Sequence, residues 1–280
     1  MTRPLAGAVV TGAGRGLGRR IARLLVARGH QVLVTDVDAA TARATAAELG
    51  DRAVAMAVDV RDQAEVEAAR DAIVARAGRL DVWVNNAGVL VTGPAWEQDA
   101  ATRRLMIEVN ALGTINGTVA AIGAMRGAGG GHVVNIVSLA GLTAVAGEAV
   151  YAASKHAAIG FSLSTMADLR AAGIKDIDIS CLCPDGIWTP MLHDKLDDPA
   201  SALSFSGTLL QPGDVVEAVR KVLDRPRLVT AVPGRRGLAA RLADFAPSVG
   251  LAAVPWVAAR GRRAQRKLLA RGVPPSTGDD

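Results

Sequence analysis

The stretch Thr11-Gly12-Ala13-Gly14-Arg15-Gly16-Leu17-Gly18 follows a short apolar run and opens a segment of helical period. Gly12, Gly16 and Gly18 have no Cβ, so the turn can be tight, a ligand can approach the backbone, and the helix can pack closely on its strand. The N–H groups and partial positive charge at the start of a helix favour an anion. The turn therefore predicts a pyrophosphate site of the kind that dinucleotides occupy.

Outward from this turn, short β-branched runs alternate with longer segments of helical period, which is typical of βαβ units. We expect strands near 6–11, 31–36, 53–58, 81–85, 132–137, 177–183 and 228–232, and helices near 16–28, 39–49, 62–77, 99–124, 149–171 and 213–224. Right-handed crossovers then give an α/β fold, a doubly wound Rossmann-type parallel sheet of about seven strands with helices on both faces. The long loop 186–212 is expected to be a lid over a ligand or disordered.

Length and charge divide the chain into two parts. At 280 residues, half of them hydrophobic, the chain can bury a sizeable core, which excludes small disulfide scaffolds and disordered polar tails. Residues 1–234 carry 23 basic and 24 acidic residues, whereas 235–280 carry nine basic and three acidic ones. We therefore predict a neutral Rossmann-fold domain over 1–234, not a nucleic-acid binder, and a basic C-terminal extension over 235–280.

The extension is expected to contain helices at 237–245 and 257–271. The apolar stretch 249–259 between them is too short to span a bilayer and contains Pro255. The expected role is a tail that caps a neighbouring subunit or is loosely ordered. The alternative is a basic helix resting on an anionic membrane surface.

Cysteine, histidine and N-terminal patterns favour a cytoplasmic protein without a metal. Cys181 and Cys183 lie two apart in a predicted strand, so they point the same way and do not easily bridge. The apolar run 5–13 is followed by glycines rather than by a cleavage site, so we do not expect a secretion signal. The four histidines are scattered and lack ligand spacing, so no metal site is predicted.

Two charged residues bear on the choice of dinucleotide. Asp36 ends the second predicted strand about 20 residues beyond the glycines, where a carboxylate accepts hydrogen bonds from ribose hydroxyls and repels a 2′-phosphate. Arg15 within the turn could instead pair with that phosphate. We expect NAD, with NADP the less favoured alternative.

A second group of polar residues follows the later strands. Tyr151, the only tyrosine, and Lys155 lie four apart at the start of a predicted helix, so phenol and ammonium share one face. A phenol with a pKa near 10 needs a neighbouring cation to act as a base at neutral pH. Ser138 closes the fifth strand, the run 85–88 closes the fourth, and Asn110 lies in the next helix, all at the edge where such sheets bind ligands.

With these motifs in this order, residues of about 5–234 resemble the short-chain dehydrogenase/reductase superfamily in its compact single-domain form. The resemblance implies that Tyr151 is the general acid/base and that Lys155 lowers its pKa and hydrogen-bonds the nicotinamide ribose. It further implies that Ser138 orients the substrate oxygen and that Asn110 holds a water in a proton relay with the lysine.

The resemblance also implies the cofactor contacts. Asp59 and Val60 match the pair that contacts adenine, and Asn86, Ala87 and Gly88 match the element that supports cofactor and sheet; the nicotinamide is lined by Pro184, Ile187 and Thr189. Asp185 departs from the family pattern, which has glycine at that place. Its carboxylate is expected either near the charged nicotinamide ring or turned to solvent.

These features predict an NAD(P)-dependent oxidoreductase that interconverts a secondary alcohol and a ketone. Segments 89–96, 139–148 and 188–210 are expected to wall an apolar pocket, with Leu142, Val145, Trp96, Trp188, Met191 and Leu192 as walls and His193 and Glu148 as polar candidates. A hydrophobic alcohol or ketone is therefore the expected substrate. The alternatives are an NAD-binding epimerase or dehydratase and a non-catalytic NAD-binding scaffold. By resemblance, we expect a homodimer or homotetramer through 99–124 and 149–171.

Overall fold

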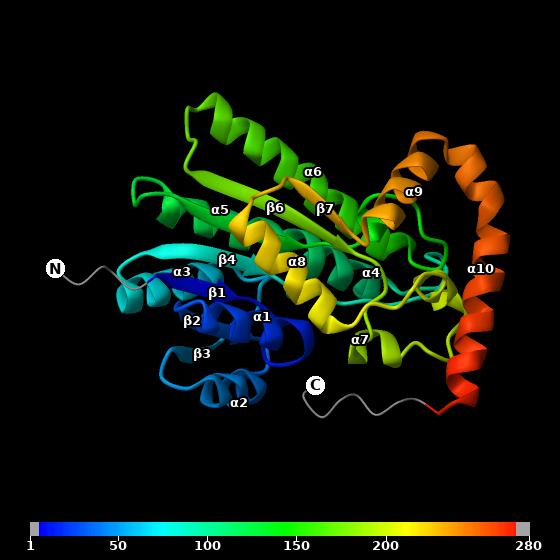
Figure 1. Ribbon diagram of the computed structural model, residues 1–280, viewed down its shortest axis with the longest axis horizontal. Helices are drawn as coiled ribbons and strands as arrows, with labels where there is room; N and C mark the ends of the chain where they lie inside the picture. The colour runs from blue at the N-terminus through cyan, green and yellow to red at the C-terminus, as the bar shows by residue number, and fades with distance from the viewer. Residues whose placement is uncertain (1–5, 273–280) are drawn as a thin grey trace.

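The computed structural model describes residues 6–272; the parts of the predicted domain and extension at 1–5 and 273–280 lie outside this range. Seven parallel strands form one sheet in the order β3-β2-β1-β4-β5-β6-β7 (Figure 1). Their bounds are β1 Gly7–Val10, β2 Gln31–Asp36, β3 Ala53–Ala57, β4 Leu80–Asn85, β5 Gly131–Ile136, β6 Ile177–Pro184 and β7 Val229–Val232. The predicted doubly wound α/β fold is confirmed.

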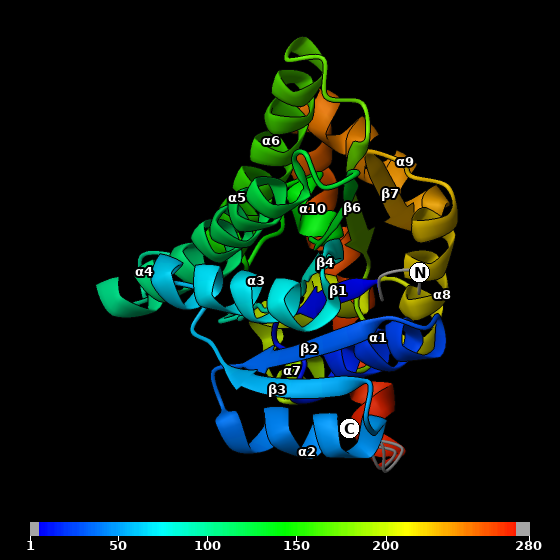
Figure 2. The same ribbon diagram turned by 90° about the vertical axis from the view of Figure 1, so that its left-hand side faces the viewer.

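Helices cover both faces of the sheet (Figure 2). One face packs on α1 Gly16–Ala27, α2 Ala39–Leu49 and α8 Pro212–Asp224, and the other on α3 Gln63–Ala77, α5 Gly113–Met125 and α6 Ala149–Ala171. The five inner strands, β1, β2, β4, β5 and β6, are largely buried, which explains their continuous apolar runs. The chain reverses strand order between β1 and β4, and the carboxyl ends of these two strands flank the crevice where doubly wound sheets bind ligands.

The predicted helix over 99–124 is divided into three segments. Helix α4, Ala100–Ile107, continues through a π-helical segment, Glu108–Leu112, into α5. The combined run Ala100–Met125 is long and apolar enough to cross a membrane, but its core-facing side packs on the sheet and 56% of its most apolar window is buried. It is therefore a core helix with one irregular turn.

The predicted lid, residues 186–212, is folded against the body. It contains α7, Pro190–His193, and a 3₁₀ segment η3, Pro199–Phe205. Within the lid, the side chains of Leu192, Leu196 and Phe205 form a small buried apolar cluster. Because the lid has its own small core, the expectation of a ligand cover fits this segment better than the expectation of disorder.

The C-terminal extension forms two helices, α9 Gly234–Phe245 and α10 Pro247–Ala270. The expected start of the second helix near 257 was wrong by ten residues, because Pro247 occupies the first helical turn, where its missing N–H costs nothing. The helix continues through Pro255, which removes one internal hydrogen bond. The extension as described is helical rather than loosely ordered.

Helix α10 packs closely on η3 of the same chain. A Cβ on Gly261 would lie 1.8 Å from the carbonyl oxygen of Ala202, so only glycine permits this approach. The buried Gln265 side chain donates to the Asp198 carbonyl at 2.8 Å and to Ser201 Oγ at 2.9 Å. The lid and the extension therefore pack directly against each other.

Candidate active site

One cavity of about 840 Å³ runs along the carboxyl ends of the strands. Its wall includes every predicted cofactor-binding residue and three of the four predicted catalytic residues: Gly12, Arg15, Gly16, Leu17, Gly18, Asp36, Asp59, Val60, Asn86, Ala87, Gly88, Pro184, Ile187, Thr189, Ser138, Tyr151 and Lys155. Only Asn110 is absent from this wall. The fold thus brings together residues that are up to 177 positions apart, from Gly12 to Thr189.

The glycine turn is held by the loop after β4. Thr11 Oγ1 accepts hydrogen bonds from the backbone N–H groups of Asn86 at 3.0 Å and Ala87 at 3.1 Å. The Asn86 side chain in turn donates to the carbonyls of Thr11 and Gly12 at 3.0 and 2.9 Å. A Cβ on Gly18 would lie 2.2 Å from the Gly12 oxygen and 2.5 Å from Asn86 Nδ2. The turn therefore has no room for any side chain at position 18.

Two further glycines are needed for different reasons. Gly12 has φ +60°, and a Cβ there would lie 2.7 Å from Ala87 Cα, so both conformation and space require glycine. Gly16 has φ +55° but meets nothing within 4 Å, so only its conformation requires glycine. The open space beside Gly16 lies at the start of α1, where the free N–H groups favour an anion.

Asp36 is fixed at the carboxyl end of β2. One carboxylate oxygen accepts from the Gly14 backbone N–H at 3.0 Å and the other from the Asp38 backbone N–H at 3.1 Å. The side chain also lines the cavity. Asp36 therefore links the glycine turn to β2 and presents a negative charge at the end of the cavity away from Tyr151.

Asp59 lies beyond β3 at the same end of the cavity. Arg61 donates to both of its oxygens, and this pairing is the main reason that the pKa of the Asp59 carboxyl lies below its usual value. The neighbouring Val60 is buried, and its carbonyl accepts from the Asn116 side chain at 3.0 Å. The pair predicted to contact adenine is thus rigidly placed in the cavity wall.

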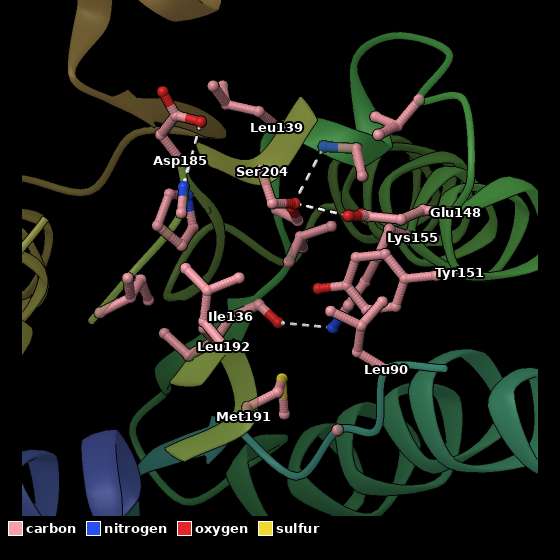
Figure 3. A pocket seen from close by; sticks show the side chains of 18 of the residues that line it. Leu90, Ile136, Leu139, Glu148, Tyr151, Lys155, Asp185, Met191, Leu192 and Ser204 are labelled. Carbon is pink, nitrogen blue, oxygen red and sulfur yellow. Dashed lines mark hydrogen bonds between the residues drawn. The ribbon is translucent and has the colours of Figure 1, made fainter. Parts of the chain in front are cut away.

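Tyr151 and Lys155 lie side by side in the cavity on the first turns of α6 (Figure 3). Lys155 Nζ is 5.5 Å from the centre of the Tyr151 ring and donates to the Ile136 carbonyl at 3.3 Å. Ser138 follows β5, and its Oγ accepts from the Ala140 backbone N–H at 3.1 Å. A hydroxyl, a phenol and an ammonium therefore converge on the same space.

Burial determines the protonation of this group. The apolar surroundings raise the pKa of the Tyr151 phenol, the nearby Glu148 carboxyl raises it further, and Ser138 lowers it by hydrogen bonding. Burial also lowers the pKa of Lys155 to about 8. Burial is the largest of the effects on Tyr151, so the net shift of its pKa is upward, and the lowering of this pKa by Lys155 stays a prediction. The phenol is therefore protonated at neutral pH.

Asn110 lies in the π-helical segment behind the cavity and is fully buried. Its side-chain oxygen accepts from the Val89 backbone N–H at 2.8 Å, and its amide donates to the Val89 carbonyl at 2.9 Å and to Ser154 Oγ at 3.1 Å. The side chain is thus occupied in holding the loop after β4. Gly88 lies between Asn110 and Lys155, since a Cβ on Gly88 would be 3.2 Å from Asn110 Oδ1 and 3.6 Å from Lys155 Nζ.

Asp185, the departure from the family pattern, pairs with the C-terminal extension. Arg236 Nε donates to Asp185 Oδ2 at 2.7 Å, and Arg236 also donates to Ser206 Oγ at 3.2 Å. The Asp185 side chain is only 7% exposed, so it is not turned to solvent. The residue therefore ties the loop after β6 to α9 instead of acting freely on a ligand.

Glu148 is a buried carboxyl group in the cavity wall, one residue before α6. Ser204 Oγ, from η3, donates to its Oε1 at 2.5 Å (Figure 3). Burial raises the pKa of Glu148 to about 7, and the carboxylates of Asp198 and Asp185 act in the same direction, against the Ser204 hydrogen bond. Glu148 is therefore a buried polar group of the substrate end.

The walls of the substrate end differ in part from those expected. Val145, Glu148, Met191 and Leu192 line the cavity, whereas Trp96, Leu142, Trp188 and His193 do not. Trp96 is 84% exposed, and Trp188 packs on the His193 ring with 4.0 Å between centroids. Sequence reasoning missed the extension's contribution, namely Arg236, Ala239, Ala240, Ala243, Asp244, Pro247, Gly250, Leu251, Ala253, Val254 and Val257. Most of these residues have small or aliphatic side chains, which gave no signal that they face a ligand.

Comparisons with known proteins agree with this geometry. The sequence profile of the short chain dehydrogenase family matches residues 6–200, and the chain belongs to that family of oxidoreductases. It is 37% identical to the sex determination protein tasselseed-2 of Zea mays over 66% of this chain and 56% of the maize protein. It is 34% identical to the NADP-dependent 3-hydroxy acid dehydrogenase YdfG of Salmonella typhi over 78% of this chain and 89% of that enzyme.

A solved structure has the same fold and contains a dinucleotide. The short chain dehydrogenase/reductase from Burkholderia phymatum in complex with NAD superposes with a TM-score of 0.78 at 26% identity, covering 88% of this chain and 95% of that one. Members of this family bind NAD(H) or NADP(H). The cradle at Gly12 and Gly18, which a Cβ would fill, and the open space at Gly16 fit the pyrophosphate of such a cofactor.

Proposed function

We propose that this protein is an NAD-dependent oxidoreductase that interconverts a secondary alcohol and a ketone on a hydrophobic molecule. One observation carries the proposal. The cavity that begins at the glycine turn ends, without a break, at Ser138, Tyr151 and Lys155 and at an apolar wall. A dinucleotide and a small organic substrate therefore fit end to end in one space.

Tyr151 is proposed to exchange a proton with the substrate oxygen. Because its phenol is protonated at neutral pH, it can donate to a carbonyl oxygen in the reductive direction. In the oxidative direction it must first lose that proton, which a cation near the phenol favours. Ser138 would hold the same oxygen through its hydroxyl, where negative charge develops.

Lys155 and Asn110 are proposed to support this proton transfer. Lys155 is buried with a pKa of about 8, so it is still mostly protonated at neutral pH and can hydrogen-bond a ribose hydroxyl beside Tyr151. Asn110 holds the backbone of Val89 and thereby shapes the wall opposite the lysine.

The cofactor would be held at three places along the cavity: by the backbone around Gly12 to Gly18, by Asp36 with Asp59 and Val60, and by Ile187 with Thr189. When bound, the nicotinamide supplies a hydride acceptor for oxidation or a hydride donor for reduction. Asp36 supports NAD over NADP, because its carboxylate would repel a 2′-phosphate at the ribose.

The substrate is proposed to be hydrophobic. At the end near Tyr151 the cavity is lined by Leu90, Val145, Met191, Leu192, Leu203 and small residues of α9 and α10. Glu148 is a buried polar group there, and Ser204 and Ser206 also line the cavity, so a second oxygen on the substrate would find hydrogen-bond partners. Terpenoid, steroid and aryl secondary alcohols have this chemistry.

The test is a spectrophotometric screen at the nicotinamide absorption band, with NAD and NADP against secondary alcohols and with the reduced forms against the matching ketones. Net cofactor reduction or oxidation with hydrophobic substrates supports the proposal. Turnover of small polar sugars or hydroxy acids alone would overturn the substrate class. Tightly held NAD without net redox change would favour an epimerase or dehydratase.

We also propose a cytoplasmic homo-oligomer. Both cysteines are free and buried in β6, which suits a reducing compartment. Assembly through α5 and α6 is supported by the exposed apolar side chains Val119 of α5 and Leu163 of α6, together with Leu112 just before α5. Light scattering on the purified protein tests the oligomeric state.

A further inference from the structure

Helix α9 presents a row of apolar side chains to solvent. Leu238, Leu242 and Phe245 are 63%, 60% and 89% exposed, and their spacing of four and three residues places them on one helical face. Such a face normally packs on the core. Here α9 packs through its other side, where Gly237 lies against Ala231 of β7. The apolar row therefore points away from the body.

Arginines flank this row on both sides. Arg235 and Arg241 are exposed, and each lies three residues from Leu238. Within the described part of the extension Asp244 is the only acidic residue, and it lines the cavity. An apolar helical stripe bordered by cations is the pattern of helices that lie in a membrane interface.

Helix α10 extends the same kind of surface. Val249, Trp256 and Arg263 are spaced by seven residues, or about two turns, so they share one face opposite the buried Ala258 and Gly261. Val249 and Trp256 are 71% and 77% exposed. Tryptophan prefers the boundary between apolar and aqueous phases, and the basic residues follow it along the helix.

The opposite side of these helices lines the cavity. Leu251 is 62% exposed and is also part of the cavity wall, so the cavity reaches the surface beside the apolar rows. A second cavity of about 580 Å³ adjoins the first, and both are lined by Ala144, Val145, Asp244, Leu251 and Val254. Its lining is mainly alanine, valine, leucine and proline. A mainly apolar route, with Asp244 and His156 as its polar residues, thus leads from this surface toward Tyr151.

We propose that this outer face of α9 and α10 is a docking face for an anionic lipid bilayer, formed by Leu238, Leu242, Phe245, Val249 and Trp256 with Arg235, Arg241 and Arg263. Docking would let hydrophobic molecules enter the cavity directly from the lipid. A second copy of the chain is a poorer occupant, because a two-fold interface would bring the arginines of both copies together. A bilayer with acidic headgroups takes up the apolar side chains and the cations at once.

The experiment is co-sedimentation of the full-length protein with phosphatidylcholine vesicles and with vesicles containing one quarter phosphatidylglycerol. We expect binding to the acidic vesicles, weak binding to the neutral ones, and loss of binding at high salt. Each cation strengthens such binding roughly fivefold, so Arg235→Glu with Arg241→Glu should weaken it at least about 25-fold. Arg126→Glu with Arg225→Glu, which makes the same charge change at exposed sites elsewhere, should weaken it far less.

The apolar part of the docking face is tested with Leu242→Ser and Phe245→Ser together. We expect a loss of at least tenfold in vesicle affinity, whereas Leu228→Ser, at a 45% exposed leucine near β7, should change little. Equal binding to neutral and acidic vesicles, or equal losses in both arginine pairs, would overturn the proposal. The proposal would also be overturned if the wild type did not bind vesicles and the Leu242→Ser, Phe245→Ser variant had a lower oligomeric state in light scattering. The face would then be a subunit interface.

Vesicle binding is measured without substrate or turnover. If the protein does not bind vesicles, the proposed oxidoreductase activity is unaffected. If that activity is absent, the vesicle result still holds.

Discussion

Replacing Glu148 by glutamine should change how stability depends on pH. Burial raises the pKa of Glu148 from 4.5 to about 7 in the folded chain. The folded state therefore holds this proton more tightly than the unfolded state does. The carboxyl group costs no stability below about pH 4.5, destabilises the fold progressively as the pH rises from there to about 7, and adds no further cost at higher pH.

The size of the effect follows from the shift. At about 1.4 kcal/mol per pH unit, the raised pKa of Glu148 costs ~3 kcal/mol of folding stability once the pH exceeds about 8, and most of this is lost between pH 5 and pH 8. Glutamine has nearly the same shape and can still accept from Ser204, but it does not ionise. The free energy of unfolding of Glu148→Gln should thus rise relative to that of the wild type by about 2–3 kcal/mol from pH 5 to pH 8.

The assay is urea unfolding followed by circular dichroism at pH 5, 6, 7 and 8, for both proteins at the same concentration. Taking the difference between the two proteins cancels the titration of groups that they share. A difference that stays constant within about 0.5 kcal/mol from pH 5 to pH 8 would refute a buried, proton-binding Glu148. The variant should also shift the oxidative pH profile downward, because the Glu148 charge raises the Tyr151 pKa.

Three further experiments probe the cavity and its surroundings. Gly18→Ala places a Cβ 2.2 Å from the Gly12 oxygen. It should lower the free energy of unfolding by about 1–3 kcal/mol and abolish the rise in melting temperature that NAD causes. The control Gly160→Ala, whose Cβ would meet nothing within 4 Å, should be neutral or stabilising in the same thermal melts. Asp36→Ser should raise kcat/KM for NADP relative to NAD at least about tenfold, and an unchanged ratio would contradict the role given to the carboxylate. A double-mutant cycle of Asp185→Ala and Arg236→Ala in urea should give a coupling energy of about 1–3 kcal/mol, and additive effects would mean that the pair does not tie α9 to the loop.

The fold and the cofactor half of the site could be predicted from the sequence because their signals are local. The glycine turn needs positive φ and close approach at positions a few residues apart, so Gly12 and Gly18 carry the information themselves. The same holds for Tyr151 and Lys155, which the helical period places on one face. Strand ends were predictable because parallel strands are buried on both sides.

The substrate half could not be predicted in the same way, because its contacts join distant segments. Asp185 and Arg236 are 51 residues apart, and Glu148 and Ser204 are 56 apart. Nothing in the local pattern of either partner indicates the other. An apolar residue type also does not reveal which way its side chain points. Trp96 was therefore expected in the pocket, but it lies outside the pocket and is 84% exposed.

The proposed oxidation or reduction with NAD depends above all on proton transfer by Tyr151. The decisive experiment compares wild type and Tyr151→Phe by NADH absorbance at 340 nm with a hydrophobic secondary alcohol that the wild type oxidises, alongside NAD binding by calorimetry. We expect turnover to fall at least about 10³-fold with NAD affinity nearly unchanged. Full activity in Tyr151→Phe would show that another group transfers the proton.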